Sequence, residues 1–277
     1  MPTLDTATGP VFYDERGAPG GAPIVLLPSG AHDHHDYDEL RDRLDPARFR
    51  TIALDWPGHG ASSAPTVPAS ATLFADVAQR LVEAVAPEGA VVVGNSVGGF
   101  SAARLAIRRP DLARGLVLID SGGFAPRPPH VRAFCALMAR PAFLRAIYPA
   151  FSASYMRCRT AADRRARATA IATTRADPGR RVVAEVWGSF AGPEHDLRAD
   201  APAIAAPTLV LHGRRDPVIP AKVARATAAL IPGARLVAFD AGHQPHTSDP
   251  DGVAAEIVHH LDSIGHGQGQ EAQGGTR

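Results

Sequence analysis

An apolar run that ends in a glycine-bracketed serine is the feature that most constrains this fold. Ala90–Gly99 reads AVVVGNSVGG, and its β-branched residues lead into a turn centred on Ser96. The next stretch, Phe100–Arg108, is compatible with a helix. A buried strand, a small-x-Ser-x-small turn and a helix together hold the serine hydroxyl at a strained corner, where Gly94 and Gly98 avoid collisions with neighbouring elements. Because the pattern is short, an ordinary glycine-rich turn or a phosphate loop is the alternative interpretation.

Apolar runs alternate with helical patterns on both sides of that corner. Continuous apolar runs are typical of strands buried on both faces, as in parallel sheets covered by helices. We therefore predict an α/β fold with a mostly parallel twisted sheet and helices on both faces. The other predicted strands are Val11–Arg16, Ile24–Leu27, Thr51–Leu54, Leu116–Ile119, Thr208–Leu211 and Arg235–Phe239. The other predicted helices are Thr72–Ala86, Ala221–Leu230 and Val253–Leu261, with a further helical pattern from about Tyr37.

The alternation stops between residues 125 and 200. This segment has a helical pattern and contains 13 arginines against six acidic residues, a net charge of +7, which leaves −6 for the remainder. We predict an inserted helical cap at 125–200 and a core formed by 1–124 and 201–264, with residues 1–10 as a loose arm. The charge asymmetry fits either an acidic partner or substrate, or solvated helix faces. The glycine- and glutamine-rich end, 265–277, is predicted to be disordered.

Composition narrows the class of protein. The chain of 277 residues is 45% hydrophobic and 21% charged, has a net charge of +1, and contains no apolar stretch long enough to span a bilayer. Its start lacks the basic and apolar regions of a secretory signal, so we expect a cytoplasmic protein that does not bind membranes. No basic patch interleaved with aromatic residues predicts nucleic-acid binding. Cys135 and Cys158 have neither metal-ligand spacing nor a disulfide framework.

Two later strands run into residues that could activate Ser96. A serine hydroxyl needs a base to accept its proton and an acid to orient that base. The strand at 208–211 is followed by HGRRD, which ends at Asp216, and the strand at 235–239 is followed by DAGH, which ends at His243. Both candidates follow the carboxyl ends of predicted parallel strands, the edge at which ligands bind in such sheets.

Neighbouring residues provide alternatives for both roles. Asp120 also ends a strand and is the alternative acid. His246 shares the loop of His243 and is the alternative base. Asp240 precedes His243 too closely to orient it, so we interpret it as a hydrogen-bonding loop residue.

Four motifs resemble the α/β-hydrolase family over about residues 11–262. In chain order they are Asp55–Ser62 (DWPGHGAS), Gly94–Gly99 (GNSVGG), His212–Asp216 (HGRRD) and Gly242–His246 (GHQPH). The resemblance implies a catalytic triad of Ser96, His243 and Asp216 and places the insertion after Asp120. In some relatives an acid at the position of Asp120 serves the histidine instead.

The same resemblance implies an oxyanion hole made of two backbone amides. One belongs to Val97, the residue after the nucleophile. The other follows the strand Ile24–Leu27 and is predicted at Ala31, in a loop where relatives often carry His-Gly and this chain has Ser29-Gly30. The implied activity is hydrolysis of a small-molecule ester or similar acyl compound through an acyl-enzyme, without cofactor or metal, by a monomer or homodimer.

Two other functions remain as alternatives. The GNSVGG form is similar to that of hydrolases that cleave carbon–carbon bonds in acidic dienoates, which a basic cap suits. This chain departs from them because its oxyanion loop lacks their run of glycines and because Gln244 stands where they usually have tryptophan. Some relatives keep a triad but act as small-molecule receptors or biosynthetic helpers. Dehalogenases and epoxide hydrolases with an aspartate nucleophile are disfavoured by serine at position 96.

The predicted substrate pocket contains His32, Phe124, Trp187 and Gln244. The run HDHHD at 32–36 resembles a metal cluster, but adjacent loop residues do not readily converge on one ion. We therefore interpret its histidines as solvated or pocket-lining, with His32 nearest the predicted oxyanion loop. Trp187 fits either the pocket or packing against the core.

Overall fold

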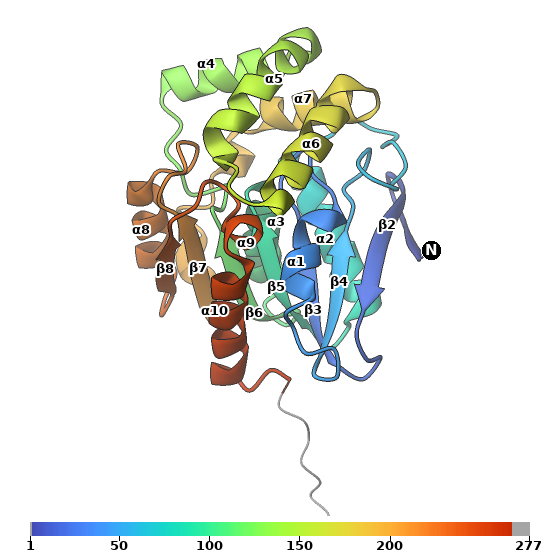
Figure 1. Cartoon of the computed structure of the whole chain (residues 1–277), viewed down its shortest axis with the longest axis vertical. Coiled ribbons are helices and arrows are strands. Elements are labelled where there is room, and N and C mark those ends of the chain that lie inside the picture. The colour runs from blue at the N-terminus through green and yellow to red at the C-terminus, as the bar shows by residue number, and fades with distance from the viewer. Residues whose placement is uncertain (1, 268–277) are drawn as a thin grey trace, which may run out of the picture.

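The computed structural model describes residues 2–267, and eight strands in this part form one sheet (Figure 1). Their bounds are β1 Thr3–Thr6, β2 Gly9–Arg16, β3 Ala22–Leu27, β4 Phe49–Leu54, β5 Ala90–Asn95, β6 Ala113–Ile119, β7 Thr208–Gly213 and β8 Arg235–Phe239. The strand order is β1-β2-β4-β3-β5-β6-β7-β8. The β1–β2 and β2–β4 pairs are antiparallel and the remaining pairs are parallel. The predicted α/β class with a mostly parallel sheet is confirmed.

Helices cover both faces of the sheet because successive side chains of its central strands point in opposite directions. In β5, Val92 packs into an apolar cluster with α2 and α3, whereas Val91 and Val93 pack into a second cluster with α10. All three valines are fully buried, as their continuous apolar run predicts. These helices and the others outside 125–200 are η1 His34–Tyr37, α1 Asp38–Arg41, α2 Ala71–Val85, α3 Val97–Arg108, η3 Ala201–Ala203, α8 Ala221–Leu230, α9 Pro245–Ser248 and α10 Pro250–Ser263.

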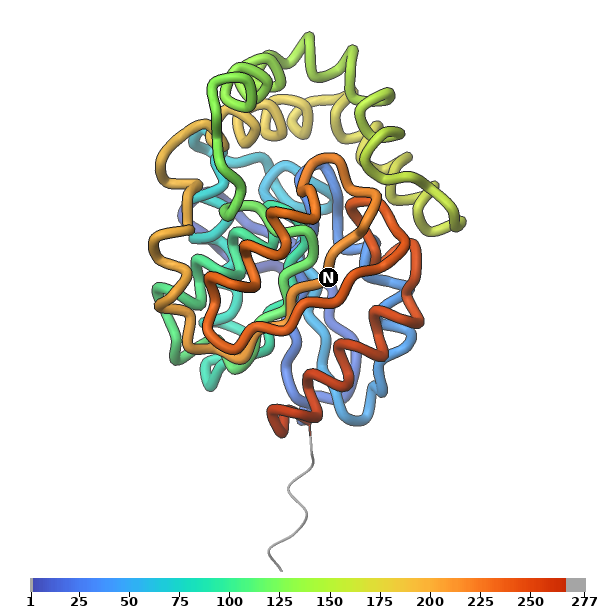
Figure 2. The backbone as a smooth tube through the Cα atoms, turned by 90° about the vertical axis from the view of Figure 1, so that its left-hand side faces the viewer, coloured from blue at the N-terminus to red at the C-terminus, as the bar shows by residue number. Residues whose placement is uncertain are grey.

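Four helices stand apart from the sheet and lie above its upper end (Figures 1 and 2). They are α4 Pro129–Met138, α5 Pro141–Met156, α6 Ala161–Arg175 and α7 Gly179–Ser189, followed by the short η2 Pro193–His195. We call the four helices α4, α5, α6 and α7 the α4–α7 layer. The layer has a small apolar core of its own, in which Leu144 and Ala170 are fully buried. Thr160 and Asp163 form a reciprocal capping box that begins α6.

The start of the chain differs from its prediction. Thr3–Thr6 forms β1 rather than a loose arm, and its sequence, TLDT, alternates between exposed and half-buried residues and contains no apolar run from which to predict an edge strand. The predicted disordered end falls mainly on residues 268–277, which lie outside the described residues. Within the described part His266 Nε2 lies 3.0 Å from the Pro23 carbonyl oxygen. No helix among residues 2–267 is both long and apolar enough to cross a bilayer.

Candidate active site

Ser96 occupies the corner between β5 and α3. Its φ of 58° is in the left-handed region, which a residue with a side chain adopts only where surrounding structure enforces it. A Cβ atom on Gly98 would lie 2.1 Å from the Leu27 carbonyl oxygen, and one on Gly94 would lie 2.2 Å from the Gly98 oxygen. Both positions therefore require glycine, for the close-approach reason expected from the sequence.

His243 and Asp216 form a buried pair below this corner. His243 Nδ1 lies 2.6 Å from Asp216 Oδ2, and the other Asp216 oxygen accepts the Val218 amide at 2.7 Å. Burial lowers the pKa of His243, but Asp216 and then Asp120 oppose it, and the net effect raises the pKa above 6.5. A neutral His243 that donates from Nδ1 to Asp216 presents Nε2 as a proton acceptor.

The loop that carries His243 is fixed from two sides. Asn95, beside the serine, donates from Nδ2 to the carbonyls of His243 and Ile119, each at 3.0 Å. On the opposite side the His243 amide donates to the Tyr155 carbonyl at the end of α5, at 2.9 Å. A Cβ atom on Gly242 would lie 2.3 Å from that same carbonyl oxygen. Neither contact was predicted, because neither leaves a local signal in the sequence.

Asp120, the alternative acid, is occupied elsewhere. Its Oδ1 lies 2.6 Å from His212 Nδ1, and its Oδ2 accepts the Gly213 amide at 3.0 Å. Burial, and then the charge of Asp216, raise the pKa of Asp120 well above 3.8. Asp120, Asp216 and His243 offer three possible metal-ligand atoms within 4.8 Å of one another. Two members of that trio are bonded to each other through His243 Nδ1 and Asp216 Oδ2, and Asp120 is bonded to His212.

The other two alternatives lie away from these groups. Asp240 is exposed and pairs with Arg159 at 2.8 Å and with Arg215 at 2.6 Å. His246 is fully buried and stacks on Tyr37 with 4.9 Å between ring centroids. Burial lowers the pKa of His246 to about 4, so the ring stays neutral at ordinary pH.

The predicted oxyanion donors differ in their surroundings. Val97 is the first residue of α3, where backbone amides have no partner within the helix, and it lines the cavity beside Ser96. The Ala31 amide instead donates to His59 Nε2 at 3.2 Å, so the prediction of Ala31 as a donor is corrected. Gly30 lines the cavity, and a Cβ atom there would lie 3.8 Å from Val97 Cγ1. The sequence signal that we missed was the DWPGHG motif, because its histidine, His59, accepts the hydrogen bond of the Ala31 amide.

A cavity with about 1000 Å³ of empty space, part of it open to solvent, lies between the sheet edge and the α4–α7 layer. Of the predicted pocket residues, only Trp187 lines it. Phe124 is 1% exposed and belongs to the larger apolar core cluster instead. His32 and Gln244 are fully buried behind the wall. Lining residues include Ser96, His243, Phe74, Tyr148, Phe151, Tyr155, Val183, Trp187 and Phe190.

The polar lining residues that were not predicted include His195 and Arg127. His195 lies between Phe100 and Phe190, with ring centroids 4.5 and 4.6 Å away. Burial, and then the charge of Arg127, lower the pKa of His195 to about 3, which keeps it neutral. Arg127 pairs with Asp196 at 3.0 Å. Arg127 lies in the segment before α4 and His195 ends the short η2, and no local pattern predicts the position of either residue.

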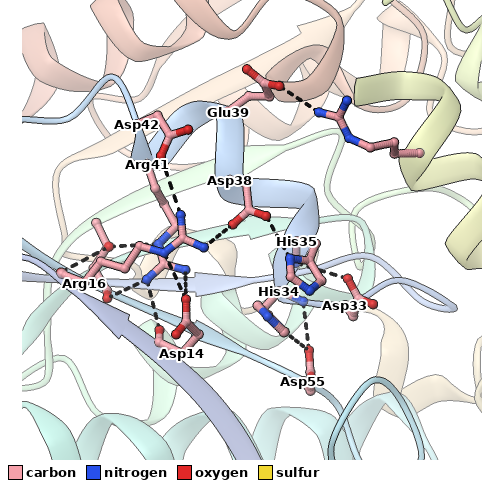
Figure 3. Close-up of polar contacts among 12 residues, drawn as sticks. Asp14, Arg16, Asp33, His34, His35, Asp38, Glu39, Arg41, Asp42 and Asp55 are labelled. Atoms are coloured by element: carbon pink, nitrogen blue, oxygen red, sulfur yellow. Dashed lines mark hydrogen bonds and ion pairs between the residues drawn. The ribbon is translucent and has the colours of Figure 1, made fainter. Parts of the chain in front are cut away.

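The histidines of the loop at 32–36 bond to different carboxylates, as Figure 3 shows for His34 and His35. His34 Nδ1 lies 2.8 Å from Asp55, and His35 Nδ1 lies 2.7 Å from Asp38. Side chains that point to different partners do not form one coordination sphere. The loop is a set of hydrogen-bonded anchors between β3 and β4.

The chain matches the family model described as the alpha/beta hydrolase fold over residues 22–250. It therefore belongs to the α/β-hydrolase family and is an enzyme of the hydrolase class.

Several relatives share most of the chain. It is 28% identical over 250 residues to a putative carbamate hydrolase from Klebsiella pneumoniae (strain 342), covering 83% of this chain and 88% of the relative. It is 30% identical over 270 residues to a pimeloyl-[acyl-carrier protein] methyl ester esterase from Edwardsiella ictaluri (strain 93-146), covering 91% and 97%. The crystal structure of the enol-lactonase from Burkholderia xenovorans LB400 superposes with a TM-score of 0.80 at 25% identity, covering 94% of this chain and 100% of the other.

Proposed function

We propose that this enzyme hydrolyses a small-molecule carboxylic ester or similar acyl compound through an acyl-enzyme on Ser96. One observation carries the proposal: Ser96, in its left-handed corner, and His243, whose Nδ1 is bonded to the buried Asp216, line the same apolar cavity. A nucleophile, a base and an orienting acid in chain order Ser, Asp, His form the arrangement used for acyl transfer in this fold. The relatives named as a carbamate hydrolase and a methyl ester esterase act on similar carbonyl compounds.

The proposed mechanism has two displacements. His243 Nε2 accepts the Ser96 proton while Oγ attacks the carbonyl carbon, and the oxyanion is held by the amides of Val97 and Gly30. Collapse breaks the bond to the leaving group, which takes the proton from His243. His243 then removes a proton from water, and the hydroxide attacks the acyl-enzyme. The second collapse returns a proton to Ser96 and releases the acid.

We further propose that the α4–α7 layer is the cap and sets substrate size. The cavity wall takes most of its surface from apolar side chains, including Phe151, Val183 and Trp187 of the layer. An apolar cavity of this kind suits a substrate whose acyl or alcohol part is largely hydrocarbon. Burial of that part excludes water from the reacting carbonyl.

Carbon–carbon cleavage of an acidic dienoate is less well supported than ester hydrolysis. Such a substrate needs a cation in the cavity for its carboxylate. Arg127, a lining arginine, is already paired with Asp196 at 3.0 Å. A triad-retaining receptor differs from both enzymes in its turnover, which the following experiment measures.

The test combines active-site labelling with turnover. The wild type should react with a fluorophosphonate at Ser96 and hydrolyse p-nitrophenyl butyrate over many turnovers. Ser96→Ala should lose the label and at least ~10³-fold in kcat, since the nucleophile is absent. Ser154→Ala, which removes an exposed serine of α5, is the matched control and should behave as wild type. Full turnover by Ser96→Ala would refute the nucleophile, and stoichiometric binding without turnover by the wild type would favour the receptor.

A further inference from the structure

A buried chain of polar side chains leads from the loop after β3 to the cavity. Asp36 Oδ2 lies 2.7 Å from His32 Nδ1, and His32 Nε2 lies 3.3 Å from the Tyr155 hydroxyl. The Tyr155 hydroxyl in turn lies 3.1 Å from that of Tyr148. All four residues are at most 4% exposed, and the proposed mechanism uses none of them. Buried polar groups are costly unless each is hydrogen-bonded, so a chain of four in one line needs an explanation.

The carboxylate at one end determines the direction of the hydrogen bonds. Asp36 also accepts from Gln244 Nε2 at 2.8 Å, so it is held as an acceptor and His32 Nδ1 donates to it. When Nδ1 carries the only ring hydrogen, the other nitrogen, Nε2, accepts, and the Tyr155 hydroxyl donates to it.

The direction then passes from one tyrosine to the next. Each hydroxyl has a single hydrogen, so the Tyr155 oxygen accepts the hydrogen of Tyr148. The Tyr148 oxygen is left with lone pairs and no hydrogen to donate. The end of the chain is an acceptor, and both tyrosines line the cavity.

We propose that the Tyr148–Tyr155 hydroxyl pair is a specificity subsite that accepts a hydrogen bond from a hydroxyl or amino group on the acyl part of the substrate. This inference rests on the proposed ester hydrolysis. The Tyr155 and His243 rings meet edge to face with 5.4 Å between centroids, so one member of the pair lies beside the base. We therefore choose a 3-hydroxyl, a group close to the scissile carbonyl, as the first substrate group to test.

Discrimination follows from the apolar surroundings of the pair. A substrate hydroxyl in an apolar cavity loses its water and needs a protein partner. One neutral hydrogen bond is worth about 1 kcal/mol, which corresponds to roughly 5- to 10-fold in kcat/KM. Asp36 and His32 act as positioning residues, because they fix the direction of the tyrosine hydrogens without contacting the substrate.

The test compares p-nitrophenyl 3-hydroxybutyrate with p-nitrophenyl butyrate. We expect wild type to favour the hydroxylated ester by about 5- to 10-fold in kcat/KM, and Tyr148→Phe, which removes the terminal acceptor, to bring the ratio near one. Tyr13→Phe, on β2, is the matched control and should keep the wild-type ratio. Circular dichroism and thermal melting check that each variant is folded. An equal ratio in wild type and Tyr148→Phe would overturn the subsite.

A binding measurement separates the subsite from the proposed function. Calorimetry with Ser96→Ala measures whether 3-hydroxybutyrate binds more tightly than butyrate, and whether adding Tyr148→Phe removes the difference. If the wild type hydrolyses neither ester, the proposed function fails, while this binding difference still supports the subsite. Equal binding of the two acids to Ser96→Ala would overturn the subsite even if both esters are hydrolysed.

Discussion

Replacing each of the two buried aspartates beside His243 by asparagine should have very different effects. Asp216→Asn turns an acceptor 2.6 Å from His243 Nδ1 into an amide that can favour the wrong imidazole tautomer. In serine proteases with the same arrangement this change costs on the order of 10⁴-fold in kcat, or about 5 kcal/mol of transition-state stabilisation. Burial of both partners favours a similar magnitude here, because water cannot replace the lost acceptor.

Asp120→Asn should cost less than ~10-fold in kcat. The amide oxygen can still accept from Gly213, and the amide nitrogen can donate to His212 Nδ1. Removing its charge should also lower the pKa of His243, which that charge helps to raise.

The assay is kcat and kcat/KM for p-nitrophenyl butyrate across the pH range, with circular dichroism as the folding control. The expected pattern is a large loss of kcat for Asp216→Asn, and for Asp120→Asn a small loss with the acid limb shifted to lower pH. A larger loss for Asp120→Asn than for Asp216→Asn would show that Asp120 orients the base. Equal, small losses would refute the triad.

Three further outcomes are expected. The wild-type acid limb of kcat/KM should have an apparent pKa above 6.5, because His243 must be neutral to act as a base and its pKa is raised; a midpoint below 6.5 would contradict this. Gly98→Ala should destabilise the fold by about 3 kcal/mol in urea unfolding, since its Cβ would lie 2.1 Å from the Leu27 oxygen; an unchanged midpoint would refute the required close approach. Asp163→Ala should cost about 2–4 kcal/mol near neutral pH, because four hydrogen bonds to this buried carboxylate are lost. The pKa of Asp163 is lowered on folding, so its stabilisation is present above the unfolded pKa and disappears as the pH falls through the folded one; a difference between wild type and variant that persists in strong acid would argue against this.

The parallel part of the sheet was predictable because each strand is a buried apolar run of its own. The predicted bounds of α8 and β8 agree with the structure, and Val91–Val93 alternate between the two cores as the strand period requires. β1 was not predictable, since Thr3–Thr6 is a polar edge strand that buries little apolar surface. Its pairing with β2 depends on the tertiary structure and leaves no local sequence pattern.

The candidate site also has one part that the sequence predicts and one part that it does not. Ser96, Asp216 and His243 could be named because each belongs to a recognisable motif that follows a strand at one edge of the sheet. Residues that reach the cavity from the α4–α7 layer could not, since an amphipathic helix does not indicate which residues of its buried face meet another segment. Tyr148 and Tyr155 illustrate this, because their spacing alone equally predicts ordinary packing within a helix.

The bond between the His243 amide and the Tyr155 carbonyl has a thermodynamic consequence. If the end of α5 lifts away from the sheet, that 2.9 Å bond breaks and the loop carrying the base loses one of its two supports. A closed layer and a correctly placed base are thus favoured together. By reciprocity, a ligand that binds better beneath the closed layer stabilises the base by the same free energy with which the placed base improves ligand binding. Substrate binding and assembly of the catalytic groups would then be one linked equilibrium, with an empty enzyme less well organised than a filled one.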